Sequence, residues 1–450
     1  MASTTHQERR TRQIVDILGD AFAPLMKADP PAFRAKYRKM AKDPHAFFRG
    51  TACLFDADVT TTDDPFVDDR CSRIWIHGDL HVENFGTYLS SDGRLVFDVN
   101  DFDEAYVGHF TWDLMRFSAS LALTGWQKAL PEDDVRRLVR RYVRAYLQQI
   151  NHYLTTDDDT DFALDLDTAT GPVLEALRDA RLIRRADLLD SMTYMDDGVR
   201  RFQADASVRR LSRTERSKVA KAFDAYLGTI PDSKRFDRTL FYDVRDMVGK
   251  SGFGIGSAGL PAYNVLVEGY SQALDNDVVL SMKQANVPAL GRFVEMPAMD
   301  GYFEHEGQRT VESQRALQAY TDPLLGYTTV DGLGYVVSEV SPYEVDLDWG
   351  GINEPDEIAE VVDQLGRATA KIHCASDEDS SQDLVDFQVE EAIASCLEGR
   401  RNAFTDHLVE FALAYAVQVR QDHALFVDAF REARIGISAT SSTSGGAGAS

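Results

Sequence analysis

The chain has 450 residues, of which 44% are hydrophobic, so it can bury a large core and form either two or three domains or one large unit with two lobes. Its net charge of −25 disfavours binding to nucleic acid or to an anionic membrane. No apolar run is long enough for a membrane span or a secretory signal, and the four cysteines are too widely spaced for a disulfide framework, so we expect a cytoplasmic protein with reduced thiols.

Helical periodicity dominates the first half of the chain. Apolar residues recur every three or four positions over residues 7–26 and 30–40, and again almost throughout residues 111–227. Two short strand-like runs lie between these segments, at residues 74–76 and 95–99. The sequence therefore predicts a large, mostly helical lobe that contains a few short strands.

The pattern changes near residue 238. Three strand-like runs follow, separated by Gly or Asp/Asn turns. After them come one predicted helix at residues 307–320 and a predicted hairpin in YTTVDGLGYVVSEV. This pattern predicts a small, mostly antiparallel sheet that carries one helix. Helical patterns then return, and the last residues are small and polar. The expected fold is α+β, with this division: a large helical lobe over residues 1–237, a small β-rich lobe over 238–345, further helices of the large lobe over 346–436 and a disordered tail over 437–450.

The segment IHGDLHVENFG, residues 76–86, follows the first predicted strand and carries several groups that bind protons or metals. Asp79 and Asn84 lie five positions apart, and Asp98 and Asp101 follow at the end of the next strand. Phosphoryl transfer needs one carboxylate that accepts the acceptor's proton, and an amide and a further carboxylate that hold Mg²⁺. Asp79 is thus a candidate base. Asn84 and Asp101 form a candidate metal site, with Asp98 as the alternative to Asp101. The segment can also be an acidic loop whose Asp and Asn residues stabilise turns.

Two histidines lie within this segment, and an arginine precedes it in the chain. We group His77 and His81 with Asp79 as candidate catalytic residues, although they are better suited to brace the loop by hydrogen bonds than to bind a metal, because Mg²⁺ prefers oxygen. Arg49, in the apolar segment FFRG, is expected to pair with a buried carboxylate; the alternative is a contact to substrate or phosphate.

A glycine-rich segment, GIGSAG at residues 254–259, separates two of the later strand-like runs. A strand, glycine loop and strand suit backbone amides that cover nucleotide phosphates, whereas the dinucleotide-binding version of this motif must open a helix. A glycine-rich hairpin turn is the alternative. The candidate nucleotide-binding residues here are Gly254, Gly256, Ser257 and Gly259.

Lys283 lies one strand further along, in the apolar run VVLSMKQA. A lysine on a strand often faces solvent. After a glycine loop, however, it is placed to contact the α- and β-phosphates of a nucleotide. Glu312, on the following helix, is the candidate anion that would hold Lys283 in place, and Glu304 and Glu306 are weaker candidates.

Together these motifs resemble the protein kinase-like fold of small-molecule phosphotransferases. HGDLHVEN resembles the catalytic motif of aminoglycoside and choline kinases, which implies that Asp79 is the base and Asn84 a magnesium ligand. DFDEAYVGHFTWDL resembles the kinase segment that begins with the second metal-binding aspartate and ends with a structural aspartate that braces the catalytic loop. The resemblance implies that Asp101 is the metal-binding aspartate and that Asp113 is the structural one.

The order of the motifs differs from that of ordinary kinases. The glycine loop and Lys283 follow the candidate base, and LGRATAKIHCAS, which resembles the helix that normally leads into the catalytic loop, lies near the carboxyl terminus. A circular permutation explains this order, and it leaves the core contacts unchanged when the two termini lie close together.

The whole pattern also resembles an uncharacterised prokaryotic family, domain of unknown function 2252. The resemblance rests on DPHAFFRG, GDLHVENFG, LVFDVNDFDEA, GIGSAG, LSMKQA and VESQRALQ. The chain departs from the expected kinase pattern at Met115, where a basic residue is expected, at Gln284 and in SEVSPYEVDLDW.

The resemblance implies a phosphotransferase that uses ATP and Mg²⁺ and acts on a hydroxyl or amine of a small molecule. Two alternatives remain open. The same fold can transfer AMP, and the chain can be a nucleotide-binding scaffold with little turnover.

Overall fold

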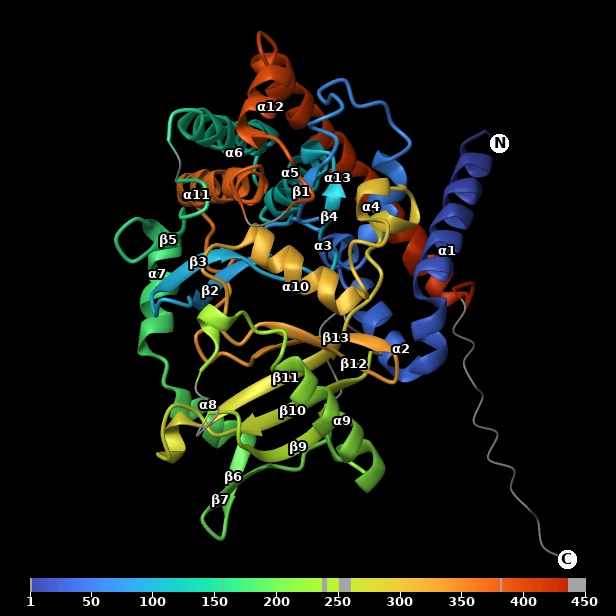
Figure 1. Ribbon diagram of the computed structural model, residues 1–450. Helices are drawn as coiled ribbons and strands as arrows, with labels where there is room; N and C mark the ends of the chain where they lie inside the picture. Colours follow the sequence, from blue (N-terminus) through green and yellow to red (C-terminus); the bar gives the residue numbers. More distant parts are fainter. Residues whose placement is uncertain (1, 157, 237–240, 251–259, 381–382, 436–450) are drawn as a thin grey trace, which may run out of the picture.

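The computed structural model describes residues 2–156, 158–236, 241–250, 260–380 and 383–435 (Figure 1). Gly254, Gly256, Ser257 and Gly259 lie outside these residues, as does the predicted tail over 437–450. Helices and antiparallel strands both contribute to the described structure, which confirms the α+β class.

Helices form most of the upper half of the molecule in Figure 1. None of the helices within the described ranges is both long and apolar enough to cross a membrane. Their bounds are α1 (Ala2–Ala28), α2 (Pro30–Met40), α3 (Pro44–Arg49), α4 (Ala52–Val59), α5 (Phe110–Gln127), α6 (Glu132–Tyr153), α7 (Gly171–Leu182), α8 (Arg185–Met192), α9 (Arg213–Tyr226), α10 (Glu306–Leu317), α11 (Pro355–Cys374), α12 (Val389–Cys396) and α13 (Arg401–Arg431).

Two aspartates fix the starts of α2 and α3. The Asp29 carboxylate accepts a hydrogen bond from the N–H of Ala32 at 3.0 Å, and the Asp43 carboxylate accepts one from the N–H of Ala46 at 2.8 Å. A proline follows each aspartate at the first helical position, where its missing N–H costs nothing. These caps position the two helices that carry Lys36 and Arg49.

Within the described residues, the strands form one six-stranded sheet and three smaller ones. The large sheet, at the bottom of Figure 1, has the order β12-β13-β11-β10-β9-β8, and all its pairs are antiparallel. The smaller sheets pair β1 with β4, β2 with β3 and β5, and β6 with β7. The strand bounds are β1 (Ile74–Ile76), β2 (Phe85–Leu89), β3 (Leu95–Val99), β4 (Tyr106–Gly108), β5 (Leu164–Asp165), β6 (Thr193–Asp196), β7 (Val199–Phe202), β8 (Val208–Arg210), β9 (Val244–Lys250), β10 (Ala262–Val267), β11 (Val278–Gln284), β12 (Gly326–Val330) and β13 (Leu333–Glu339).

The predicted hairpin is confirmed as β12 and β13. Its two turn residues, Asp331 and Gly332, have φ angles of 51° and 81°. A two-residue turn of this kind needs left-handed conformations at both positions, which aspartate tolerates and glycine adopts freely. The hairpin fixes the register of β13 against β11, the strand that carries Lys283.

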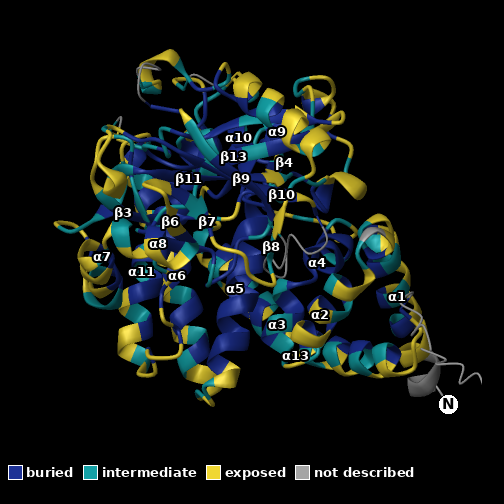
Figure 2. Cartoon of the chain, turned by 90° about the horizontal axis from the view of Figure 1, so that it is seen from below, coloured by how far each residue is buried: buried dark blue, intermediate teal, exposed yellow. Residues whose placement is uncertain are grey.

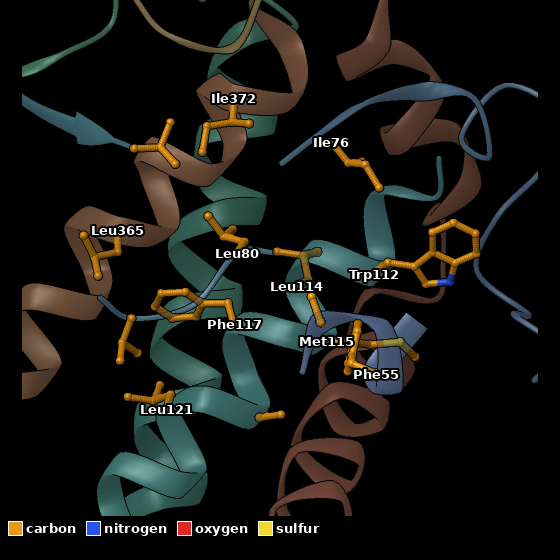
Figure 3. Packing of buried hydrophobic residues seen from close by; sticks show 14 of the residues in the cluster. Phe55, Ile76, Leu80, Trp112, Leu114, Met115, Phe117, Leu121, Leu365 and Ile372 are labelled. Carbon is orange, nitrogen blue, oxygen red and sulfur yellow. The ribbon is translucent and has the colours of Figure 1, made fainter. Parts of the chain in front are cut away.

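Separate hydrophobic cores lie under the helices and under the large sheet. The larger core is built around α5, which is dark blue along almost its whole length in Figure 2. Figure 3 shows Leu80, from the loop after β1, among side chains of α5 and α11 such as Leu114 and Ile372. The predicted catalytic segment is therefore anchored in the largest core by its own apolar residues.

The second core joins residues from both sides of the boundary expected at residue 238. It contains Phe223 and Tyr226 of α9 together with residues of β10, β11 and β13, and β8 pairs with β9 at the edge of the large sheet. Residues 193–226, which the sequence assigns to the helical lobe, thus contain a hairpin, a further strand and a helix that accompany the sheet.

Candidate functional site

A cleft of about 460 Å³ lies between the loops that follow β1 and β3 and the face of the large sheet. Asp79, Asn84 and Asp101 line it from the early part of the chain, and Lys283 lines it from β11. Helix α10, which crosses the middle of Figure 1, contributes Gln314 and other residues to the same cleft. Side chains far apart in the sequence therefore meet around one cavity.

The backbone of the HGD segment is held by Asp113, near the start of α5. Its carboxylate accepts hydrogen bonds from the N–H of His77 at 2.6 Å and from the N–H of Gly78 at 2.9 Å. Gly78 has a φ angle of 79°, and a Cβ at this position would lie 2.1 Å from the carbonyl oxygen of Glu104. Only glycine fits this position, and the bracing role predicted for Asp113 is confirmed.

The two histidines have different surroundings. Nε2 of His77 donates to the carbonyl of Asn100 at 2.8 Å, and its Nδ1 accepts from the N–H of Asp79 at 3.3 Å, so His77 joins the loop after β1 to the loop after β3. His81 lines the cleft, and burial, with Arg49 and Arg116 nearby, holds the pKa of this imidazole well below its usual range. His81 is therefore neutral at pH 7.

Asp79 forms an ion pair with Arg116, a residue of α5 with none of its surface exposed. Arg116 also donates from Nη2 to the carbonyl of Phe48 at 3.0 Å, and its guanidinium lies 4.2 Å from the centre of the Phe48 ring. The basic residue that the sequence pattern lacks at Met115 is thus supplied by the next position. This arrangement fixes the Asp79 side chain at the edge of the cleft.

Asn84 and Asp101 present oxygen atoms that suit a hard cation. Nδ2 of Asn84 donates to the carbonyl of Asp79 at 2.9 Å, which leaves its Oδ1 without a donor among the described residues. Burial, Asp103 and Asp79 raise the pKa of Asp101 to about 6, while His77 and Lys283 oppose this rise. A divalent cation here would relieve the repulsion between these carboxylates.

These oxygens do not form a dense, all-protein metal cage. Within the described part of the chain, the one group of three such ligands with atoms close together is Asp68, Cys71 and Cys396, away from the cleft. Mg²⁺ in phosphotransfer sites is commonly held by one or two side-chain oxygens together with waters and phosphate oxygens. The residues present therefore fit a metal ion that arrives with a nucleotide.

Asp98 does not line the cleft, although the sequence offered it as the alternative metal ligand. It is 1% exposed and forms an ion pair with Lys371 of α11, which also donates to the carbonyl of Leu317 at 2.7 Å. A carboxylate paired in this way is a structural group. The geometry thus favours Asp101 over Asp98 as the metal-binding carboxylate.

Lys283 and Glu312 do not share a site. Glu312 forms an ion pair with Arg315 on its own helix at 2.9 Å and does not line the cleft; Glu306 likewise pairs with Arg309 at 2.6 Å. The Lys283 ammonium instead lowers the pKa values of Asp101 and Glu344. Burial still raises the pKa of Glu344 to about 7, so this residue of the loop after β13 is a more suitable neighbour for Lys283 than Glu312.

Arg49 forms an ion pair with Glu83 of the HGDLHVEN segment, and not with the buried carboxylate that the sequence predicts. Both side chains are about one-third exposed, and both line the cleft. Because the pair is open to the cavity, a substrate in the cleft can also contact Arg49.

Arg116, Glu344 and Lys371 are the residues around this site that sequence reasoning missed. Each makes its contact across a long stretch of chain. Lys371 lies within LGRATAKIHCAS, but nothing in that segment indicates its partner. The sequence holds one signal for two of them. Arg116 lies inside the apolar helix pattern of α5, and Lys371 inside that of α11; a charged residue buried in this way needs a partner of opposite charge.

The comparisons with known proteins give a family and no closer relative. Neither the curated proteins nor the solved structures yielded a match to this chain. The family described as "Uncharacterized protein conserved in bacteria (DUF2252)" matches residues 28–429, and the chain therefore belongs to it.

Proposed function

We propose that the protein is a magnesium-dependent phosphotransferase that uses ATP and acts on a small-molecule acceptor. One observation carries the proposal: Asp79, Asn84, Asp101 and Lys283 line the same cleft, although they come from two distant parts of the chain. A carboxylate base, an amide and a carboxylate for the metal, and a cation for the phosphates are the groups that phosphoryl transfer requires.

Each residue then has a defined task. Asp79, held by Arg116, accepts the proton of the acceptor hydroxyl and orients that group. Oδ1 of Asn84 and the carboxylate of Asp101 would hold Mg²⁺, which would neutralise charge on the phosphates. Lys283 would contact the phosphate oxygens from the opposite side of the cleft.

A circularly permuted kinase-like fold is the architecture that we propose with this function. The large sheet supplies Lys283, and the loops under the helices supply the carboxylates. Helix α11, late in the chain, contacts β1 and reaches Asp113 through His373 Nε2 at 3.3 Å. Helices α1 and α13 also pack together through Arg10 and Asp422, an arrangement that makes such a permutation physically simple.

The test separates nucleotide binding from chemistry. Purified protein is titrated with Mg²⁺ and ATP in a calorimeter, and γ-phosphate and AMP transfer from labelled ATP are then followed separately. We expect binding in the micromolar range and transfer of the γ-phosphate. Asp79→Asn should lower kcat by about 100-fold or more with little change in nucleotide affinity, because the base acts in the transition state.

Two further variants locate the metal. Asp101→Asn should weaken Mg²⁺-dependent ATP binding, whereas Asp63→Asn, the same change at an exposed carboxylate outside the cleft, should leave it unchanged. Equal behaviour of these two variants, or transfer of AMP in place of γ-phosphate, would contradict the proposal. Binding of ATP without any turnover would instead support a nucleotide-binding scaffold.

A further inference from the structure

A second, smaller pocket of about 60 Å³ adjoins the main cleft. The two cavities share Arg49, Asp79, Asp101 and Asp103. The other walls of the small pocket come from α1, α2, α4 and the segment 286–292, and neither Lys283 nor any residue of β11 or β13 lines it. The candidate base therefore lies between a large cavity on the side of the sheet and a small one beside the N-terminal helices.

Lys36 of α2 lines the small pocket and is only 4% exposed. Its ammonium lies 3.8 Å from the centre of the Phe22 ring, and no described residue accepts a hydrogen bond from it. Burial lowers the pKa of Lys36 to about 8, and Cys53, Glu104 and Asp79 oppose this effect. Since these three residues also line the pocket, the ammonium faces the cavity, still charged at pH 7.

Burial of an ammonium whose three N–H groups have no acceptor is unfavourable in free energy unless a ligand accepts their hydrogen bonds. The nearby acids do not serve this purpose. Asp79 is paired with Arg116, and the Glu104 carboxylate accepts a hydrogen bond from the N–H of Ala289. Arg292 adds a second cation to the walls, whereas Arg49 is already paired with Glu83. The pocket therefore favours a ligand that brings its own negative charge.

The size of the pocket limits that ligand. One water molecule needs about 10–15 Å³ of such space, so 60 Å³ admits a carboxylate with a few attached atoms. A doubly charged phosphate would be repelled more strongly than a carboxylate by Asp79, Asp101 and Asp103, which line the same pocket. A carboxylate is therefore the anion that fits best.

We propose that the small pocket binds the acceptor, and that the acceptor is a small hydroxy acid whose carboxylate pairs with Lys36 and whose hydroxyl group reaches Asp79. This inference rests on the phosphotransferase function proposed above. The hydroxyl oxygen forms a bond to the γ-phosphorus of ATP, and the bond from that phosphorus to the β–γ bridging oxygen breaks. ADP leaves with the electron pair, and Asp79 takes the proton.

The experiment compares acids with their uncharged counterparts. The probes are L-lactate, glycerate, L-malate and L-serine, each paired with its carboxamide and assayed with labelled ATP and Mg²⁺. We expect at least one acid to be phosphorylated with a kcat/KM at least about tenfold above that of its amide, because a charged hydrogen bond is lost in the amide. Calorimetric binding of the same pairs gives a measurement that does not depend on turnover.

Lys36→Met tests the proposed contact directly. We expect the KM for the acid to rise by roughly 10- to 100-fold, the preference for acid over amide to disappear and the affinity for ATP to stay unchanged. Lys39→Met, at an exposed position on the same helix, is the matched control and should behave as the unaltered protein. If Lys36→Met fails to fold, the comparison of acid with amide in the unaltered protein decides.

The outcomes distinguish this inference from the function on which it rests. A protein that binds Mg²⁺ and ATP but treats acid and amide alike, or accepts none of the acids, overturns the acceptor assignment alone. An unchanged KM in Lys36→Met does the same. A protein that binds no nucleotide overturns both.

Discussion

Arg116 is the residue on which the position of Asp79 depends. Its Nε contacts the Asp79 carboxylate, its Nη2 holds the carbonyl of Phe48, and its flat guanidinium lies against the Phe48 ring. A planar group with donors on two edges makes these contacts at once, and an ammonium on a flexible chain does not. We therefore expect the arginine, and not merely a positive charge, to be required.

Arg116→Lys tests this requirement. The variant keeps the charge but loses one of the two anchors, so we expect the free energy of unfolding to fall by about 1–3 kcal/mol and kcat to fall by about tenfold or more, with ATP affinity preserved. Urea denaturation and steady-state kinetics measure the two effects. Arg137→Lys, in an exposed ion pair on α6, is the control and should change neither quantity. A variant at position 116 with full kcat would show that Arg116 does not position the base.

The residues of the site differ in how far the sequence could predict them. Asp79, Asn84 and Asp101 lie within a short segment, and their spacing alone indicates phosphoryl-transfer chemistry. The pairing of Arg116 with Asp79 depends on how α5 packs beside the loop, which no local pattern encodes. Glu312 is the neighbour that the helix motif predicts for Lys283, but on α10 its carboxylate pairs with Arg315 and does not line the cleft.

At the scale of elements, α11 joins the helical core to the site. Lys371 pairs with Asp98 of β3, and His373, the penultimate residue of α11, lies between Tyr146 of α6 and Asp113. All five side chains of these contacts are buried. The helix therefore fixes the position of β3 relative to the loop after β1. We expect the loss of one of these contacts to lower the free energy of unfolding more than it lowers kcat.

The Lys371–Asp98 pair gives a prediction about this helix. Removal of one partner leaves an uncompensated buried charge, so Lys371→Met or Asp98→Asn alone should lower the free energy of unfolding by about 3–5 kcal/mol. The double variant should recover much of this loss, because no buried charge remains. Denaturant titration of the two single variants and the double variant checks the expectation; strictly additive losses would show that the pair is not coupled.

The elements that the sequence predicts well are those with strong local signals. Strands β1 and β3 and helix α2 have the predicted bounds, and the long apolar patterns of α11 and α13 are helical as expected. Strands β6 and β7 were missed, although Asp197 and Gly198 between them are turn residues with φ angles of 48° and 77°. Three of the four residues of β6 are exposed, and the buried positions of β7 are Arg200 and Phe202. Neither sequence therefore shows the apolar–polar alternation that identifies a half-buried strand.

At the scale of the whole molecule, burial leaves several acids protonated near neutral pH. Burial raises the pKa values of Glu104, Glu339, Glu344 and Glu390 to about 7, from an ordinary value near 4.5. In the unfolded chain these groups are ionised above pH 6. The folded protein thus binds more protons than the unfolded chain between these values, and its stability depends on pH in that range.

The direction of this dependence follows from the proton balance. A raised pKa in the folded state contributes stability that is complete below the unfolded pKa and is lost as the pH rises through the folded pKa, so the free energy of unfolding should fall between pH 6.5 and 8. We expect a loss of about 2–3 kcal/mol for the four glutamates together. Other groups act outside this window: the lowered pKa of His45, about 4, affects stability below pH 6.5, and that of Lys36, about 8, affects it at higher pH.

Urea denaturation at pH 6.5, 7.2 and 8.0 measures this dependence without any ligand. Glu390→Gln should make it shallower, because a neutral amide replaces a carboxyl group whose Oε2 is buried without a hydrogen-bond partner among the described residues. Glu398→Gln, at an exposed position, should leave it unchanged. A free energy of unfolding that stays constant from pH 6.5 to 8 would mean that these glutamates are already ionised in the folded protein, and would contradict the prediction.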